Sequence, residues 1–182
     1  MATYVLFGSR GRMYPGHPMR AMQLLLVEDS ASDIRLVKEA LKETGVPVQM
    51  TIMRDGVEAL EHLRNVELGF AGRPDIILLD LNLPRKNGRE VLSEVKSSPN
   101  LKQIPVLVMT SSQSDEDVNQ CYALNANCYI TKPGDLDNYI DVVRAIEDFW
   151  FFTARLPEPP RPFHEGAGLG SLKHSSSIAT VH

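Results

Sequence analysis

Short apolar runs alternate with amphipathic segments along the middle of the chain. Five short runs are rich in apolar residues, as expected for strands that are buried on both faces of a sheet, and they cover residues 24–27, 48–53, 76–79, 105–109 and 128–130. Each run is followed by apolar residues at helical spacing, which predict helices around residues 34–41, 60–63, 91–95, 118–124 and 136–156. The pattern therefore predicts five strand–helix units.

Cap residues support the boundaries of these helices. Ser30 with Asp33 three residues later, and Ser114 with Asp117, form the pairings that cap helix N-termini. Gly45 stands where the first helix is expected to end. Five strand–helix units with apolar strands predict an α/β fold, in which a doubly wound, five-stranded parallel sheet carries helices on both faces.

The two ends of the chain differ in composition from the middle. Residues 1–22 show no apolar period and contain several glycines and prolines. Proline, glycine and serine are frequent in residues 157–182, a composition that cannot form a packed core. We expect a flexible N-terminal extension over residues 1–22, one domain over residues 23–156 and a disordered tail over residues 157–182.

Composition and charge exclude several classes of protein. The chain of 182 residues has only two cysteines, which excludes a disulfide scaffold and a four-cysteine zinc site. No apolar run approaches the roughly 20 residues of a membrane helix, and no secretory signal is present, so we expect a cytoplasmic protein without a membrane partner. Residues 23–156 carry 14 basic and 21 acidic residues, which argues against nucleic-acid binding.

Reactive side chains directly follow four of the predicted strands. Glu28 and Asp29 come after the first, Asp80 after the third, Thr110 at the end of the fourth and Lys132 after the fifth. Because the carboxyl ends of parallel strands share one edge of the sheet, these side chains should converge. Carboxylates at close range repel unless a cation neutralises them, and Mg²⁺ prefers oxygen ligands. Each residue alone is more often a cap or a turn residue, but five in one register favour a magnesium-dependent site.

Four motifs occur in a fixed order along the chain. They are Glu28-Asp29, the sequence Asp-Leu-Asn-Leu-Pro at 80–84 with Gly88 beyond it, Met-Thr-Ser at 109–111, and Tyr-Ile-Thr-Lys-Pro at 129–133. In this order they resemble the receiver domain of bacterial two-component response regulators, over about residues 23–150. The resemblance implies a flavodoxin-like receiver fold with strand order 2-1-3-4-5. It also implies that Asp80 accepts a phosphoryl group from a phosphohistidine of a sensor histidine kinase.

The resemblance implies roles for the neighbours of Asp80. Asp29, Asp80 and the backbone carbonyl of Asn82 would hold Mg²⁺, with Glu28 assisting through a water. Lys132 would supply a positive charge to a phosphate oxygen, as suits a lysine ammonium. Phosphoryl transfer needs such positioning and charge neutralisation more than covalent machinery, so the residue types fit the reaction.

A switch pair is also implied by the resemblance. Thr110 would donate a hydrogen bond to the phosphoryl group, and Tyr129 would rotate inward in response. The alternative for Tyr129 is a half-buried strand aromatic with its hydroxyl in water. We further expect the peptide bond before Pro133 to be cis, which would aim Lys132 into the site.

The last predicted helix carries a cluster of aromatic residues. Consecutive helical residues are about 100° apart, so Phe149, Trp150, Phe151 and Phe152 cannot all face the sheet. An apolar surface of this kind must be covered, and we expect a homodimer through these residues. The alternative is that the C-terminal tail folds back over them.

The output of the protein is expected to be a contact with another protein. Only the 26 residues 157–182 follow the predicted domain, which favours a single-domain regulator. The segment from Ile146 to Trp150 and the loop from Asp80 to Gly88 resemble those of small regulators that partner bacterial phytochrome-type histidine kinases. A kinase of that type is the expected partner.

Two other functions were weighed against a phospho-acceptor. Phosphatases of the haloacid dehalogenase type also use an Asp after a strand, but they need a second Asp two residues later, where this chain has Asn82. A pseudo-receiver would act as an interaction adaptor without phosphorylation, and the complete set of site residues counts against it. A phospho-acceptor that is not itself an enzyme acting on other substrates is the preferred interpretation.

Overall fold

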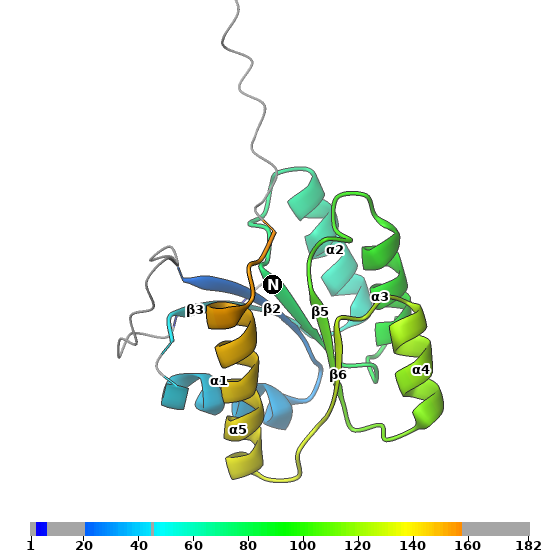
Figure 1. Cartoon of the computed structure of the whole chain (residues 1–182). Coiled ribbons are helices and arrows are strands. Elements are labelled where there is room, and N and C mark those ends of the chain that lie inside the picture. The colour runs from blue at the N-terminus through cyan, green and yellow to red at the C-terminus, as the bar shows by residue number, and fades with distance from the viewer. Residues whose placement is uncertain (1–2, 7–20, 45, 158–182) are drawn as a thin grey trace, which may run out of the picture.

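The computed structural model describes residues 3–6, 21–44 and 46–157. These residues form one sheet with helices on both faces (Figure 1). The strands are β1 (Thr3–Leu6), β2 (Met22–Val27), β3 (Val48–Met53), β4 (Ile76–Leu79), β5 (Val106–Thr110) and β6 (Cys128–Thr131). The helices are α1 (Ala31–Thr44), α2 (Gly56–Glu67), α3 (Gly88–Ser97), α4 (Asp115–Ala123) and α5 (Leu136–Ile146), and a π-helix, η1 (Glu147–Thr153), continues α5.

The five predicted strands are parallel neighbours in the order β3-β2-β4-β5-β6. Without the edge strand β1 this is the order 2-1-3-4-5, so the predicted doubly wound parallel sheet is confirmed. The strand order reverses at β2, where Leu24 lies opposite Met50 of β3 and Ile76 of β4. In such sheets, ligands bind beyond the carboxyl ends of the strands near this reversal.

The sheet has a sixth strand that the sequence pattern did not predict. β1 pairs antiparallel with the outer edge of β3, with Thr3 opposite Ile52 and Leu6 opposite Gln49. The expectation of a flexible extension over residues 1–22 is therefore wrong for residues 3–6. A four-residue strand is too short to show a period, and the pairing that holds it comes from a strand distant in sequence. Residues 7–20 lie outside the described residues.

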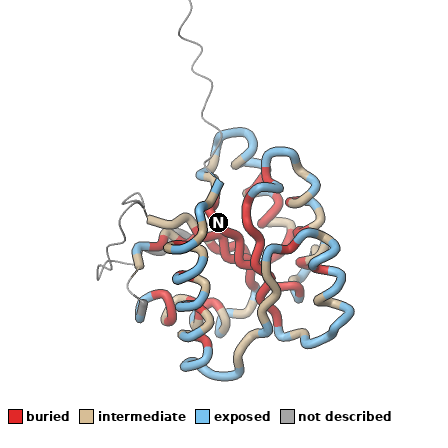
Figure 2. Tube along the Cα trace, in the orientation of Figure 1, coloured by how far each residue is buried: buried red, intermediate tan, exposed pale blue. Residues whose placement is uncertain are grey.

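The core lies in two halves, one on each face of the sheet. Leu25 and Val27 pack with residues of α2, α3 and α4, whereas Leu24 and Leu26 pack with residues of α1, α5 and η1. The central strands β4 and β5 are buried at every position, and the outer sides of the helices are exposed (Figure 2). Successive strand residues point to opposite faces, and this explains why the central strand β4 is apolar at every position.

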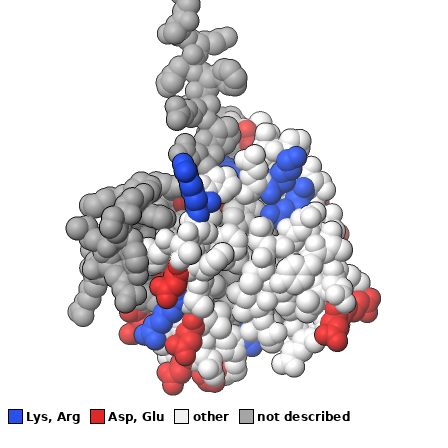
Figure 3. All heavy atoms as spheres, in the orientation of Figure 1, with Lys and Arg blue, Asp and Glu red and all other residues white. Residues whose placement is uncertain are grey.

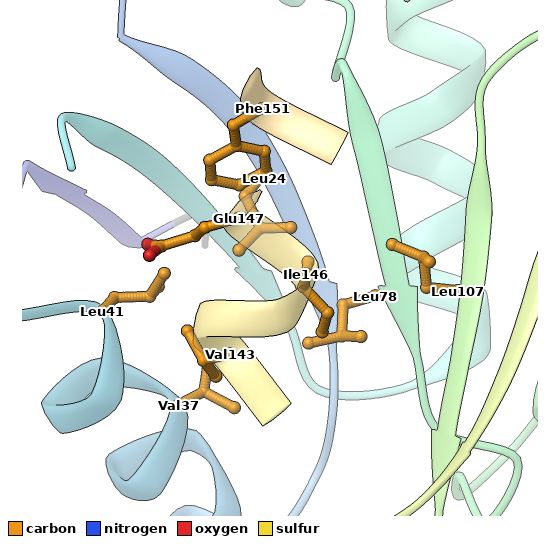
Figure 4. A pocket seen from close by; sticks show the side chains of 9 residues that line it. All are labelled: Leu24, Val37, Leu41, Leu78, Leu107, Val143, Ile146, Glu147 and Phe151. Carbon is orange, nitrogen blue, oxygen red and sulfur yellow. The ribbon is translucent and has the colours of Figure 1, made fainter. Parts of the chain in front are cut away.

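The C-terminal helix departs from the predicted single helix over residues 136–156. α5 ends at Ile146, and the chain continues as a π-helix from Glu147 to Thr153. Glu147 and Phe151 are buried there and line a cavity of about 20 Å³ between α1, α5 and the sheet, together with Leu24 and Val37 (Figure 4). The expectation that Phe151 lies at a dimer interface is therefore wrong, because its ring belongs to the chain's own core.

The other aromatic residues of η1 are more accessible than Phe151. Phe149 is 53% exposed and stands edge-on to Trp150, with ring centroids 5.1 Å apart and planes at 87°. Trp150 and Phe152 are half-buried and pack against the core half formed with α1 and α5. Among the four aromatic residues of η1, Phe149 is therefore the one whose ring projects into solvent.

No helix within the described residues is both long and apolar enough to cross a membrane. Residues 158–182, which make up almost all of the predicted disordered tail, lie outside the described residues. The predicted domain of residues 23–156 falls within the described part of the chain, apart from Gly45.

Candidate functional site

The predicted site residues gather at the carboxyl edge of the sheet. Glu28 and Asp29 directly follow β2, Asp80 directly follows β4, Thr110 ends β5 and Lys132 directly follows β6. β2 and β4 are paired neighbours, and the N–H of Asp80 donates to the carbonyl of Val27 at 3.0 Å. The pairing of the strands thus brings the acidic pair and Asp80 to one place.

Three carboxylates lie close enough to share one cation. One oxygen each of Glu28, Asp29 and Asp80 lies within 4.8 Å of the other two. Glu28 and Asp80 are buried, whereas Asp29 is exposed, so one side of the group is open to water. Mg²⁺ takes oxygen ligands and usually keeps several waters, and this donor set therefore fits the ion. The carbonyl of Asn82 stays a predicted ligand.

The ammonium of Lys132 contacts three carboxylates at once. Its Nζ lies 2.7 Å from Glu28 Oε2, 2.7 Å from Asp80 Oδ2 and 2.6 Å from Asp33 Oδ2. The side chain of Lys132 is only 10% exposed. A lysine ammonium has three N–H donors, so each donor has one carboxylate acceptor.

Burial and charge shift the ionisation of this group in opposite directions. Burial raises the pKa of Glu28 to about 7, and the hydrogen bond from Lys132 offsets only part of that effect. Burial also lowers the pKa of Lys132, but its hydrogen bonds to Asp33, Asp80 and Glu28 outweigh this and the net shift is upward. Lys132 is therefore a fixed positive charge, whereas Glu28 exchanges a proton near neutral pH.

Asp33 is a site residue that the sequence pattern did not single out. It was interpreted as a partner of the cap residue Ser30, and its N–H does donate to Ser30 Oγ at 3.3 Å. Its carboxylate also turns toward the sheet edge and accepts from Lys132. Its position in the first turn of α1, shortly after the acidic pair that follows β2, is the only signal in the sequence.

The loop between β4 and α3 forms one wall of the site. The N–H of Asn82 donates to Asp80 Oδ1 at 3.1 Å and the N–H of Gly88 donates to the carbonyl of Leu81 at 2.9 Å. A Cβ on Gly88 would lie 2.0 Å from the carbonyl oxygen of Asp80. Gly88 is therefore required by the close approach of α3 to the end of β4.

Thr110 is fully buried at the end of β5. Its hydroxyl oxygen lies 3.5 Å from Asn82 Nδ2 and 3.5 Å from the N–H of Ser112, both long contacts. The N–H of Lys132 donates to the carbonyl of Thr110 at 2.8 Å. None of the described peptide bonds is cis, so the predicted cis bond before Pro133 is wrong. Pairing of β6 with β5 places Lys132 at the site instead.

Tyr129 is joined to the loop between β5 and α4. Its half-buried hydroxyl donates to the carbonyl of Ser112 at 3.0 Å. Ser112 Oγ in turn donates to Asp117 Oδ2 at 2.6 Å, and Asp117 forms an ion pair with Arg89 of α3. The hydroxyl is thus tied by a hydrogen bond to Ser112, which lies two residues after Thr110.

Charged side chains are unevenly spread over the face that carries α4, β6 and α5 (Figure 3). Acidic side chains gather over the first turn of α4, where Asp115, Glu116 and Asp117 lie. The surface between α4 and α5 is largely uncharged (Figure 3). Tyr122 of α4, which is 50% exposed, contributes an aromatic ring to the surface of α4.

Comparison with known proteins identifies related sequences. The model of the response regulator receiver domain matches residues 24–144. The response regulator Rcp1 of Synechocystis sp. is 48% identical over 135 residues, which are 74% of this chain and 92% of that protein.

Solved structures give the same result. The phosphorylated cyanobacterial phytochrome response regulator RcpA is 49% identical with a TM-score of 0.72, covering 76% of this chain and 100% of that chain. The Mn²⁺-bound form of response regulator Rcp1 is 47% identical with a TM-score of 0.70, covering 75% of this chain and 99% of that chain. The sequence and structure comparisons thus give the same relatives and cover similar shares of the chain.

Proposed function

The chain belongs to the response regulator receiver domain family, and on that premise we propose that Asp80 accepts a phosphoryl group from a phosphohistidine of a sensor histidine kinase. The observation that carries the proposal is the position of Asp80, which lies between a carboxylate group fit for Mg²⁺ and the ammonium of Lys132. The 48% identical relative Rcp1 and the phosphorylated form of RcpA support it.

The attacking atom is Asp80 Oδ2 in this proposal. The N–H of Asn82 holds Oδ1, and Lys132 contacts Oδ2, which orients the carboxylate. Oδ2 forms a bond to phosphorus while the phosphorus–nitrogen bond of the phosphohistidine breaks. The electron pair of that bond stays on the imidazole nitrogen, which takes a proton from water. Lys132 donates to a phosphoryl oxygen and offsets its negative charge.

Asp29, Asp80 and the carbonyl of Asn82 would hold the metal, with Glu28 assisting through a water. The Mn²⁺-bound structure of Rcp1 supports a divalent cation, and Mg²⁺ suits an all-oxygen donor set. Bound Mg²⁺ supplies positive charge that offsets the carboxylates and the transferring oxygens. Asp29 is exposed to solvent, so water molecules can complete the coordination of the ion.

Thr110 and Tyr129 form the proposed switch. The hydroxyl of Thr110 has only long contacts, so it is available for a phosphoryl oxygen. A shift of Thr110 would move Ser112, whose carbonyl accepts from Tyr129. Release of that hydrogen bond would let the ring of Tyr129 turn inward and change the surface between α4 and β6.

The output is a protein–protein contact in this proposal, with a phytochrome-type kinase upstream. The relative RcpA is named as a cyanobacterial phytochrome response regulator, which supports that partner. A homodimer through η1 stays part of the proposal, with Phe149, Trp150 and Phe152 in the contact. The exposed ring of Phe149 is its anchor.

Phosphorylation is tested with Mg²⁺, a small phosphodonor and intact mass. Wild type should gain about 80 Da, the mass of one phosphoryl group, and Asp80→Asn should gain nothing because an amide is not a nucleophile. The matched control is Asp141→Asn, a remote and exposed position that should behave as wild type. An unmodified wild type would favour the pseudo-receiver, and a modified Asp80→Asn would place the acceptor elsewhere.

The dimer is tested by sedimentation with and without phosphodonor. Phe149→Ser should weaken self-association, whereas Phe70→Ser, which removes an 81% exposed ring from the loop after α2, should not. Phosphorylation should shift dimer affinity by the usual coupling of about 1–3 kcal/mol. A wild type that stays monomeric at high micromolar concentration in both states would favour the C-terminal tail as the cover of η1.

A further inference from the structure

The three N–H donors of Lys132 have unequal acceptors. Glu28 and Asp80 belong to the carboxylate group that fits a metal ion, but Asp33 does not. A cation at that group would compete with Lys132 for the oxygens of Glu28 and Asp80. Asp33 is therefore the one acceptor of Lys132 whose role stays the same whether or not a cation is bound.

Asp33 makes two local hydrogen bonds at the start of α1. Its N–H donates to Ser30 Oγ at 3.3 Å, and its Oδ1 accepts from Ser32 Oγ at 3.4 Å. Oδ2 is then left for Lys132 at 2.6 Å. Groups on a rigid helix hold a functional side chain more precisely than groups on a loop. The carboxylate of Asp33 is thus oriented before any ligand arrives.

Packing against a neighbouring helix fixes the position of α1. α1, which carries Asp33, packs along α5, and Tyr139 of α5 is 1% exposed. Burial and the nearby charge of Asp33 raise the pKa of Tyr139. Asp33 therefore lies on a helix whose position is fixed by packing against α5.

We propose that Asp33 is a positioning residue for phosphoryl transfer: it anchors the ammonium of Lys132 through one N–H, so that another N–H stays aimed at Asp80 Oδ2 and at the phosphoryl oxygen that arrives there. This proposal rests on the proposed function. When Asp80 Oδ2 becomes bonded to phosphorus, the N–H of Lys132 that donated to Oδ2 donates to a phosphoryl oxygen instead. The bond to Asp33 does not have to break.

The proposal predicts which property changes when the anchor is removed. In Asp33→Ala the ammonium keeps Glu28 and Asp80 but loses its fixed third acceptor. The phosphorylation rate with a small phosphodonor should fall about 10-fold, since small misplacements of catalytic groups reduce rates by such factors. Mg²⁺ affinity should change less than about threefold, because Asp33 is not among the carboxylates that fit the metal. Asp33→Glu, which keeps a carboxylate, should recover part of the rate.

The test is a double-mutant cycle of Asp33→Ala and Lys132→Ala, with Asp141→Asn as the control for loss of a remote negative charge. If Asp33 acts through Lys132, its removal should have no further effect on the rate in the Lys132→Ala background. A second readout needs neither metal nor reaction. In metal-free wild type the Nζ protons of Lys132 should exchange slowly enough for detection by NMR, and Asp33→Ala should speed that exchange.

The outcomes separate this inference from the proposed function. If wild type is not phosphorylated, the proposed function fails, while the exchange measurement still tests the anchor. If wild type is phosphorylated and Asp33→Ala reacts at the same rate or faster, the positioning role of Asp33 is overturned. An equal 10-fold loss in both backgrounds would also overturn it, because Asp33 would then act independently of Lys132.

Discussion

Two lysines with similar burial lie at opposite edges of the sheet and differ in their partners. Lys132, at the carboxyl edge, contacts three carboxylates. Lys96, in the last turn of α3 at the amino edge, donates to the carbonyls of Lys102 at 3.3 Å and Ile104 at 2.8 Å and to Asn127 Oδ1 at 2.8 Å. Three charged acceptors surround one ammonium and three neutral acceptors surround the other.

The difference appears in the ionisation of the two groups. Burial lowers the pKa of Lys96 to about 8, whereas the carboxylates shift the pKa of Lys132 upward despite its burial. The neutral oxygen acceptors of Lys96 hold segments of the chain together through its ammonium, which is a structural role. The carboxylate acceptors of Lys132 can instead bind a metal ion, while Lys132 donates to a phosphoryl group. The charge of the acceptors thus separates a structural lysine from a functional one.

The largest expected effect comes from replacing each lysine by methionine. Lys132→Met should slow phosphorylation by about 100-fold, since the site loses a donor to the developing negative charge. Lys96→Met should leave the rate unchanged and lower the free energy of unfolding by about 1–3 kcal/mol, because its oxygen acceptors lose their donor. Rates by intact mass and urea unfolding of both variants make the comparison. Equal losses of phosphorylation rate in the two variants would contradict the distinction between a functional Lys132 and a structural Lys96.

Metal binding should affect only the carboxyl edge. Saturating Mg²⁺ should raise the free energy of unfolding of wild type by about 1–3 kcal/mol at roughly 10- to 100-fold excess over its dissociation constant. The gain should be smaller at pH 6 than at pH 8, because Glu28 has a pKa of about 7 and its protonated form does not bind a cation. Asp29→Ala should lose most of the gain, and Lys96→Met should keep it. A full Mg²⁺ gain in Asp29→Ala would place the ion elsewhere.

The smallest expected effect is on the pH dependence of stability. The folded pKa of Lys96 is about 8 and its ordinary value is 10.5, so between these values the unfolded chain binds more protons than the folded one. The contribution of Lys96 to the free energy of unfolding should therefore rise with pH in that window. Urea unfolding of metal-free wild type and Lys96→Met from pH 7.5 to 10 should show a more positive slope for wild type. Parallel curves would contradict the lowered pKa.

The sequence allowed the parallel sheet and the set of residues at its edge to be predicted, because both depend on local patterns. Apolar runs such as residues 76–79 are strong signals for buried strands, and Asp80 and Lys132 follow such strands directly. The spacing of Asp33 from Ser30 also fits a helix cap, and its contact with Lys132, 99 residues further along the chain, forms only in the folded protein.

The unpredicted features depend on contacts between distant segments. β1 is held by β3, some 45 residues further along the chain, as the pairing of Thr3 with Ile52 shows. The π-helix turns Phe151 into the core, whereas spacing for an α-helix gave no reason to separate Phe151 from Phe149. Lys96 likewise joins α3 to residues 102–104 and to Asn127, and no sequence pattern indicates these acceptors.

The measurement that most directly tests a phospho-acceptor role for Asp80 is chemical trapping of the modified residue. Wild type is incubated with Mg²⁺ and a small phosphodonor, reduced with borohydride and digested for peptide mass analysis. An aspartyl phosphate is an acyl phosphate, which borohydride reduces to homoserine. Homoserine at position 80, dependent on Mg²⁺ and absent in Asp80→Asn, is the expected result. Homoserine at Asp29 or Asp33, or at no position while the protein is folded and binds Mg²⁺, would contradict the account.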